Sequence, residues 1–162
     1  MKRSSASARP ARREHDRSAA AAAQESFIPL MRALVRAYQG FERYSSSHIR
    51  ELGLTPPQFD VIATLGNTQG MPMYKLGEET LITKGTLTGV IDRLEKKGLV
   101  RREVDSEDRR CFNVVLTPKG ERLFEAIFPA HIAHLKARFD RMSEVEQMRL
   151  RRALERLEQI FT

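Results

Sequence analysis

The residues whose types could do chemistry gather at the start of a predicted helix that follows Thr83. The small, hydroxyl-bearing or basic residues on this stretch are Lys84, Gly85, Thr86, Thr88 and Gly89. Two glycines beside β-branched neighbours cost roughly 0.5–1 kcal/mol each in helix propensity, which indicates a face shaped for contact. Free N–H groups at a helix start, an ammonium group and hydroxyls suit DNA phosphates and base edges in a major groove. The alternative is an ordinary surface helix that tolerates glycine.

The helix that must position these residues is marked at both ends. Its apolar residues have the i, i+3, i+4, i+7 spacing of one buried face, and they are Leu87, Val90, Ile91 and Leu94. Thr83 has the type of an N-cap, and Gly98 stands where a left-handed residue ends a helix. Leu94 and Leu99 can then make the accompanying apolar contact. We predict one helix between Thr83 and Gly98.

A β-hairpin is predicted directly after this helix. The β-rich runs 99–104 and 111–116 are joined by the polar segment 105–110. A short helix, a capped helix and then a hairpin with a charged tip is the order of a winged helix-turn-helix. The residues resemble the MarR family of bacterial transcription regulators. The pattern R-L-E-x-K-G-L matches 93–99, D-x-x-D-R-R matches 105–110, and L-T-x-x-G matches 116–120.

This resemblance implies a recognition helix and a wing that bind DNA. We expect Thr83, Lys84, Thr86, Thr88 and Arg93 to face the major groove or its phosphates, with Gly85 and Gly89 allowing close approach. Arg109 and Arg110 would reach the minor groove or its backbone, oriented by Asp105 or Asp108 through charge-assisted hydrogen bonds. The alternative for the wing is a solvated turn, because its acids, Asp105, Glu107 and Asp108, repel phosphate.

Length and composition fit one compact domain. The chain has 162 residues, 41% of them apolar, which suffices for a core. A single Cys excludes an internal disulfide framework and a Cys-based zinc finger. No apolar run is long enough to cross a membrane, so we expect no membrane contact and a cytoplasmic, nucleoid-associated protein. The net charge of +7 favours polyanionic partners.

The positive charge is concentrated in an N-terminal arm. Residues 1–17 hold six basic and two acidic side chains, a net +4, which leaves +3 for the remaining 145 residues. The arm, residues 1–25, has no apolar periodicity and is predicted to be disordered. Its apolar run, Ala19 to Ala23, is too short for a secretory signal, and Glu14 and Asp16 argue against a transit peptide. The arm is either a non-specific DNA contact or a solvated tail.

Residues 26–162 are predicted to form a single MarR-like domain, mainly α with a small β-hairpin wing. An amphipathic helix is expected over about 26–48. Thr55 to Gln58 is a capping box, so a helix should begin at Pro56 and end near Gly66. Pro72 is expected to open a short helix through Glu79. The winged helix-turn-helix covers about 54–116.

Two further helices are predicted at the C-terminal end, over about 117–162. One begins at Thr117-Pro118, and the other follows a second capping box at Ser143 to Glu146. Long apolar stripes at both ends of the chain have little of the winged unit to pack against. We expect them to form a homodimer with two-fold symmetry, as the resemblance also implies. The alternative is an intramolecular bundle.

Two smaller groups of residues suggest chemistry of other kinds. His131 and His134 are three apart on a helix and could share a metal, but a zinc site needs a third ligand, and none is nearby in sequence. We therefore expect no metal, while a metal-responsive regulator stays open. Cys111 lies on a predicted strand, away from the first long helix where the family's peroxide sensors carry their reactive Cys. No catalytic residues, phosphate-binding loop or cofactor signature stands out, so an enzyme is not expected.

The resemblance also implies an effector site where the dimerisation helices meet the winged unit. Family members bind small aromatic or phenolic acids there, with a His or Arg for the carboxylate. The residues of this chain that would form it are Tyr38, Phe41, Tyr44, His48 and Arg50. His48 could equally be a helix-terminal residue that complements the helix dipole.

The sequence therefore predicts a sequence-specific DNA-binding regulator, a dimeric repressor released from a palindromic operator by an aromatic acid. The rival interpretation is an architectural DNA-binding protein without ligand control. A regulator should prefer a palindromic site over random DNA by about 10³-fold or more. The sequence does not identify the effector, the operator, the regulated genes or the sign of regulation.

Overall fold

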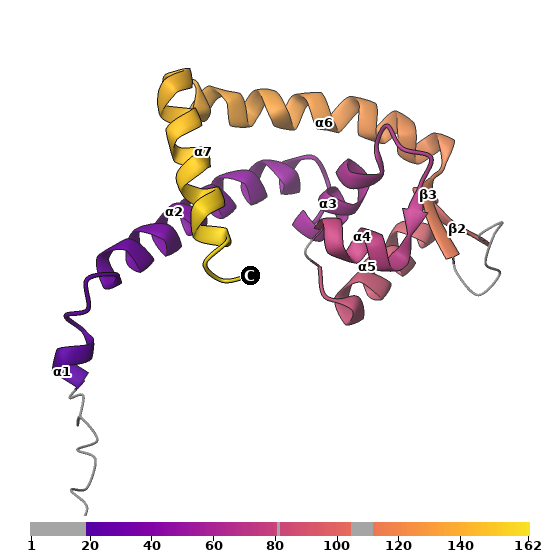
Figure 1. The fold of residues 1–162 in the computed structure, drawn as a ribbon. Helices are drawn as coiled ribbons and strands as arrows, with labels where there is room; N and C mark the ends of the chain where they lie inside the picture. The colour runs from indigo at the N-terminus through magenta and orange to yellow at the C-terminus, as the bar shows by residue number, and fades with distance from the viewer. Residues whose placement is uncertain (1–18, 81, 105–111) are drawn as a thin grey trace, which may run out of the picture. The chain divides into compact units, whose positions relative to one another are not determined.

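The computed structural model describes residues 19–80, 82–104 and 112–162, apart from the side chains of Ala20 and Lys84. The chain divides into two compact units, residues 1–40 and 41–162. The first contains α1, Ala19–Ala22, and the beginning of α2, Ile28–Glu51. The second contains the rest of α2 and all later elements (Figure 1).

The second unit consists of helices around a small antiparallel sheet. After α2, its elements in chain order are α3 (Pro56–Leu65), β1 (Met71–Pro72), α4 (Met73–Thr80), α5 (Lys84–Lys96), β2 (Val100–Val104), β3 (Phe112–Leu116), α6 (Pro118–Phe139) and α7 (Glu144–Glu158). The strands lie in the order β1-β3-β2. Val100 pairs with Leu116 and Val104 with Phe112, so β2 and β3 form the predicted hairpin. The fold is mainly α with a small wing, as predicted.

The hydrophobic core lies between α3, α4, α5 and the sheet. Its most buried side chains, at 0–2% exposure, are Val61, Ile62, Leu65, Leu76, Leu87, Val90, Ile91, Leu94, Val100 and Val114. Burying one such aliphatic side chain contributes roughly 1.5–3 kcal/mol. Phe124 and Ile127 bring the first half of α6 onto the same core. The apolar spacing in the sequence therefore identified the inward faces correctly.

The segment before α4 differs from the prediction. Pro72, expected to open a helix, lies in β1, and α4 begins one residue later at Met73. Met71 pairs with Val114 and Pro72 with Asn113. Proline is compatible with this position because β1 is an edge strand. The turn into β1 uses Gly70, whose φ is +89° and whose missing Cβ would lie 2.3 Å from Val115 Cγ1.

The terminal helices have exposed apolar side chains. Val145, Leu150 and Leu154 of α7 are each 45–50% exposed, and no residue of Glu144–Glu158 is buried. In the first unit, Leu30 and Tyr38 of α2 are exposed as well. The short helix α1 lies within the arm predicted to be disordered, and residues 1–18 fall outside the described residues. No helix in the described part of the chain is long and apolar enough to cross a membrane.

Candidate nucleic-acid interface and histidine cluster

Helix α5 is fixed by its apolar face, and this leaves its N-terminal half open to solvent. Leu87, Val90 and Ile91 are at most 1% exposed and anchor the helix in the core. Thr83, Gly85, Thr86 and Thr88 are exposed. The helix ends as predicted: Gly98 has φ +68°, its N–H donates to the Glu95 carbonyl at 2.8 Å, and the Leu99 N–H donates to the Leu94 carbonyl at 3.0 Å.

The start of α5 has an unusual cap. Thr83 occupies the N-cap position with extended backbone, but its side chain accepts no bond from the helix backbone. Its hydroxyl instead donates to the Thr86 Oγ1 at 3.1 Å. The N-cap position predicted for Thr83 is confirmed, while the expected capping bond is replaced by a link between two hydroxyls. The amide groups of the first turn therefore receive no bond from the Thr83 side chain, although the Leu87 N–H donates to the Thr83 carbonyl at 2.9 Å. The N–H groups at a helix start attract anions.

Among the described residues, no packing contact requires either glycine of this face. A Cβ at Gly85 would meet nothing within 4 Å, and one at Gly89 would lie 3.5 Å from Arg93 Nη1, an ordinary contact with a flexible side chain. Arg93 thus lies alongside Gly89 on the helix surface. Because each glycine lowers helix stability by roughly 0.5–1 kcal/mol, its use is better explained by something outside the chain that approaches closely.

A second group of polar side chains lies between α2 and α6. We call it the histidine cluster: His48 of α2, with His131 and His134 of α6. The Nδ1 atoms of His48 and His131 are 3.0 Å apart, and His131 Nε2 is 3.1 Å from Ser45 Oγ. The His48 and His134 rings stack with centroids 4.1 Å apart, and Tyr44 stacks on His134 at 4.1 Å. The cluster thus joins the two helices through aromatic stacking and hydrogen bonds.

The cluster also contacts the winged unit and a cation. His131 packs edge-on against Phe59 of α3, with ring centroids 4.6 Å apart. The Arg138 guanidinium lies 4.7 Å over the Tyr44 ring, and the Tyr44 hydroxyl donates to the His134 carbonyl at 3.0 Å. His134 Nε2 is buried and has no hydrogen-bond partner within the described part of the chain.

Electrostatics favour a neutral imidazole at the centre of the cluster. His131 is 3% exposed, and burial lowers its pKa, with a further lowering from the neighbouring His48 and His134. The two Nδ1 atoms that face each other need one proton between them, and a neutral His131 can accept or supply it. On α3, burial raises the pKa of Asp60.

Comparison with known proteins decides what kind of molecule this is. The family model described as "MarR family" matches residues 54–112. MhqR of Bacillus subtilis, an HTH-type transcriptional regulator, is 34% identical over 122 residues, which cover 75% of this chain and 84% of MhqR. This chain belongs to the MarR family. It is a DNA-binding winged-helix transcriptional regulator.

Solved structures of MarR-type regulators share the fold. AbsC of Streptomyces coelicolor is similar with a TM-score of 0.76 and 26% identity, over 82% of this chain and 92% of AbsC. BpsR of Bordetella bronchiseptica, whose DNA binding is regulated by 6-hydroxynicotinic acid, gives 0.71 and 28%, over 80% of this chain and 98% of BpsR. NadR in complex with 4-hydroxyphenylacetate gives 0.66 and 26%, over 77% and 89%.

Within the MarR fold, the structure places some of the residues predicted for DNA contact and omits others. Thr83, Gly85, Thr86, Thr88, Gly89 and Arg93 all lie on α5 or at its start and away from the core. The Lys84 side chain is outside the description. Asp108, Arg109 and Arg110 of the wing, together with Cys111, lie outside the described residues, although β2 and β3 lead directly to them.

The residues predicted for an effector site are only partly brought together. His48 belongs to the histidine cluster, Tyr44 stacks on its His134, and Phe41, 46% exposed, precedes both on α2. Tyr38 belongs to the first unit. Arg50 is exposed and follows His48 by two positions, which turns it about 200° round the helix axis from His48. Among the described residues, the arginine whose guanidinium lies over the Tyr44 ring beside the cluster is Arg138, and not Arg50.

Sequence reasoning missed Ser45 and Arg138 and treated His131 and His134 as a possible metal pair. The missing third imidazole is His48, 83 residues away from His131 in sequence. The His48 ring stacks on that of His134, so their nitrogen atoms do not point at a common centre. The described residues contain no group of three potential ligands that could hold a metal. The spacing of His131, His134 and Arg138, which share one face of α6, was the available signal.

Proposed function

We propose that this protein is a homodimeric, sequence-specific regulator that is released from a palindromic operator by a small aromatic acid. The observation that carries the DNA-binding half is the open N-terminal face of α5, where no contact with the described residues requires the two glycines. Lys84 would bind phosphate, and Thr86 would read a base edge or contact phosphate. Arg109 and Arg110 of the wing would enter the adjacent minor groove, oriented by Asp108.

The dimer is supported by apolar surface that a single chain leaves uncovered. A groove of about 800 Å³ lies between the end of α6 and α7, and its apolar lining includes Phe139, Met148, Leu150 and Leu154. None of the residues that line it belongs to the histidine cluster. A second copy of the chain would bury this face and place two recognition helices on half-sites about one helical turn apart.

The histidine cluster supports effector binding for chemical reasons. The rings of Tyr44, His134 and His48 now stack on one another, so an aromatic ring that enters this stack would meet flat faces in place of the ones it displaces. Arg138, beside Tyr44, offers a planar fork to a carboxylate. The unpartnered His134 Nε2 can exchange a hydrogen bond with a phenol or carboxylate. The aromatic acids named with BpsR and NadR are of this class.

Contacts within the second unit suggest how such a ligand would act. Because His131 touches Phe59 of α3, a ring inserted beside His131 would press on the helix that supports α5. A shift of a few ångströms between two recognition helices breaks their match to the half-sites. The ligand must bind the DNA-free arrangement more tightly than the DNA-bound one to shift anything.

Selection from random oligonucleotides tests the DNA-binding part. We expect the purified protein to enrich a palindromic sequence and to prefer it over random DNA by about 10³-fold or more. Tight binding without enrichment would favour the architectural protein instead.

An effector panel tests the switch. Phenolic and heteroaromatic acids, zinc and peroxide are titrated into the complex with the enriched DNA. We expect an aromatic acid to release the DNA, and to require at least tenfold more ligand with His48→Ala. Arg50→Ala is the matched control on the same helix and should respond as the wild type does. Release by zinc alone would favour the metal-responsive regulator, and no release by any compound would remove ligand control.

A further inference from the structure

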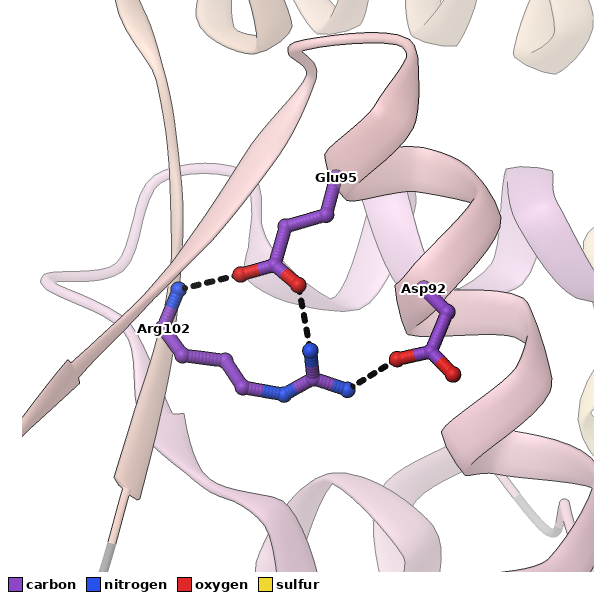
Figure 2. A network of polar contacts seen from close by, with 3 residues as sticks. All are labelled: Asp92, Glu95 and Arg102. Carbon is purple, nitrogen blue, oxygen red and sulfur yellow. Dashed lines mark hydrogen bonds and ion pairs between the residues drawn. The ribbon is translucent and has the colours of Figure 1, made fainter.

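One polar network joins the recognition helix to the wing. Asp92 and Glu95, three residues apart on α5, both face β2 and hold Arg102 (Figure 2). The Arg102 guanidinium donates to Asp92 Oδ1 at 2.6 Å through one Nη atom and to Glu95 Oε2 through the other. The two carboxylates thus bind the two ends of one planar fork, which a compact ammonium group cannot imitate.

Glu95 makes a second bond that fixes the backbone of the strand. Its Oε1 accepts the Arg102 N–H at 3.0 Å, so one carboxylate binds both the side chain and the main chain of the same residue. β2 is an edge strand, because the sheet order is β1-β3-β2. An edge N–H that points away from the sheet needs a partner, and α5 supplies it. The strand is therefore held at a defined height along the recognition helix.

A neighbouring ion pair differs from this network in what it connects. Arg101 binds Glu103 at 2.6 Å, but both residues belong to β2 and their side chains are 50% and 47% exposed. The side chains of Arg102 and Glu95 are 26% and 32% exposed, while that of Asp92, at 49%, is as exposed as the Arg101 pair. The Arg101 pair joins no two elements, whereas the Arg102 network connects α5 with β2.

We propose that Arg102 is a positioning residue, which with Glu95 and Asp92 sets the place of the wing strands against the recognition helix before DNA arrives. This inference rests on the proposed DNA contacts of α5 and the wing. Two elements that must fit one DNA site at once bind best when their relative position is fixed in advance, because otherwise binding must order them. A loosened network should therefore cost affinity chiefly at the operator, where the fit is demanding.

The Glu95→Gln variant gives a test in which two explanations predict opposite signs. Removing an acid from a DNA-binding helix should tighten binding if charge alone matters. If Glu95 positions the wing, the variant should lose roughly three- to tenfold affinity for the enriched operator, since a charge-assisted bond becomes a neutral one. Affinity for random DNA should not fall. The matched control is Glu103→Gln, which removes an acid from β2 without loosening α5 and should keep or raise operator affinity.

Further variants distinguish positioning from general destabilisation. All are measured at a temperature at which circular dichroism shows them folded. Asp92→Asn, which leaves the Glu95 bonds in place, should give the same effect in smaller size, and Arg102→Lys should retain only part of the selectivity. In a double-mutant cycle on operator affinity, Glu95→Gln should cost little once Arg102→Gln is present.

Two outcomes would overturn the proposal. One is a Glu95→Gln variant that binds the operator as tightly as the wild type or more tightly, in parallel with Glu103→Gln. The other is an equal loss on operator and random DNA. Failure of the proposed function is seen separately, because the wild type itself would then enrich no operator.

Discussion

Helices α5 and α7 have the same kind of apolar stripe and opposite surroundings. In α5 the stripe is at most 1% exposed, whereas Leu150 and Leu154 of α7 are 45% and 46% exposed. The spacing of apolar residues shows that a helix has an apolar face, but it does not show which element or partner covers that face. Within one chain, α5 is covered by its neighbours in the winged unit. The described residues leave the apolar face of α7 exposed, and in the proposed dimer a second copy of the chain covers it.

The largest effect expected from this comparison is on the stability of the winged unit. Leu94→Ala removes a fully buried side chain from α5 and should cost about 2–5 kcal/mol of unfolding free energy through lost burial and a cavity. Chemical denaturation followed by circular dichroism measures it. Leu154→Ala is the matched change on α7 and should cost much less at protein concentrations where the chain is a monomer. Equal costs would mean that α7 is covered within its own chain.

The second prediction concerns assembly. Leu154→Asp places a charge in the apolar groove and should weaken the dimer by roughly 2 kcal/mol or more, about 30-fold in dissociation constant. Sedimentation equilibrium over a concentration series measures the shift. Arg152→Asp introduces the same acid on the same helix, at a residue that does not line the groove, and should have little effect. A monomeric wild type, or equal shifts in both variants, would contradict an interface on α7.

The comparison also explains how far the sequence could predict the fold. The boundaries of α3, α5, α6 and α7 follow from signals within a few residues: capping boxes, a proline at a helix start, and Gly98. β1 has no local signal, because its two residues become a strand only by pairing with β3, some 40 positions away. Pro72 was therefore assigned to a helix start, which was wrong by one residue.

The histidine cluster was beyond sequence reasoning for a related reason. His131 and His134 were correctly placed on one helix face, but their partner His48 lies on another helix. The residues near them in sequence therefore carry no signal of the third imidazole. The hydroxyl link between Thr83 and Thr86 and the clasp of Glu95 on Arg102 depend on side-chain geometry in the same way. Local patterns identify elements, whereas sites arise where elements meet.

The next prediction concerns pH and His131 of α6. The first half of this helix packs on the core, and its end borders the groove at α7. Burial lowers the pKa of His131 below its ordinary value of 6.5. Between the two pKa values the unfolded chain binds more protons at His131 than the folded chain does. The stability that the neutral His131 contributes is therefore fully present above about pH 6.5 and is lost as the pH falls through the lowered pKa. One group can contribute at most about 1.4 kcal/mol per pH unit.

Denaturation at several pH values between 5.5 and 7.5 measures this slope. His131→Gln, which cannot titrate, should have a flatter profile than the wild type. Asp60, whose pKa is raised by burial, adds a slope of opposite sign, but both proteins contain it, so the difference between the two profiles isolates His131. A wild-type profile that is no steeper than that of His131→Gln over this window would contradict a buried neutral His131.

The smallest expected change bears on the open face of α5 itself. Gly89→Ala adds a methyl group that would lie 3.5 Å from a flexible Arg93 nitrogen, so the fold accommodates it. Helix propensity then predicts a gain of roughly 0.5–1 kcal/mol in stability. If the face approaches DNA closely, the same methyl group should lower operator affinity.

Gly40→Ala on α2, where a Cβ would meet nothing within 4 Å, is the control that should gain stability and leave DNA binding unchanged. A Gly89→Ala variant that gains stability and binds the operator normally would show that this glycine does not lie against DNA, and a loss of stability would show that the chain itself requires it.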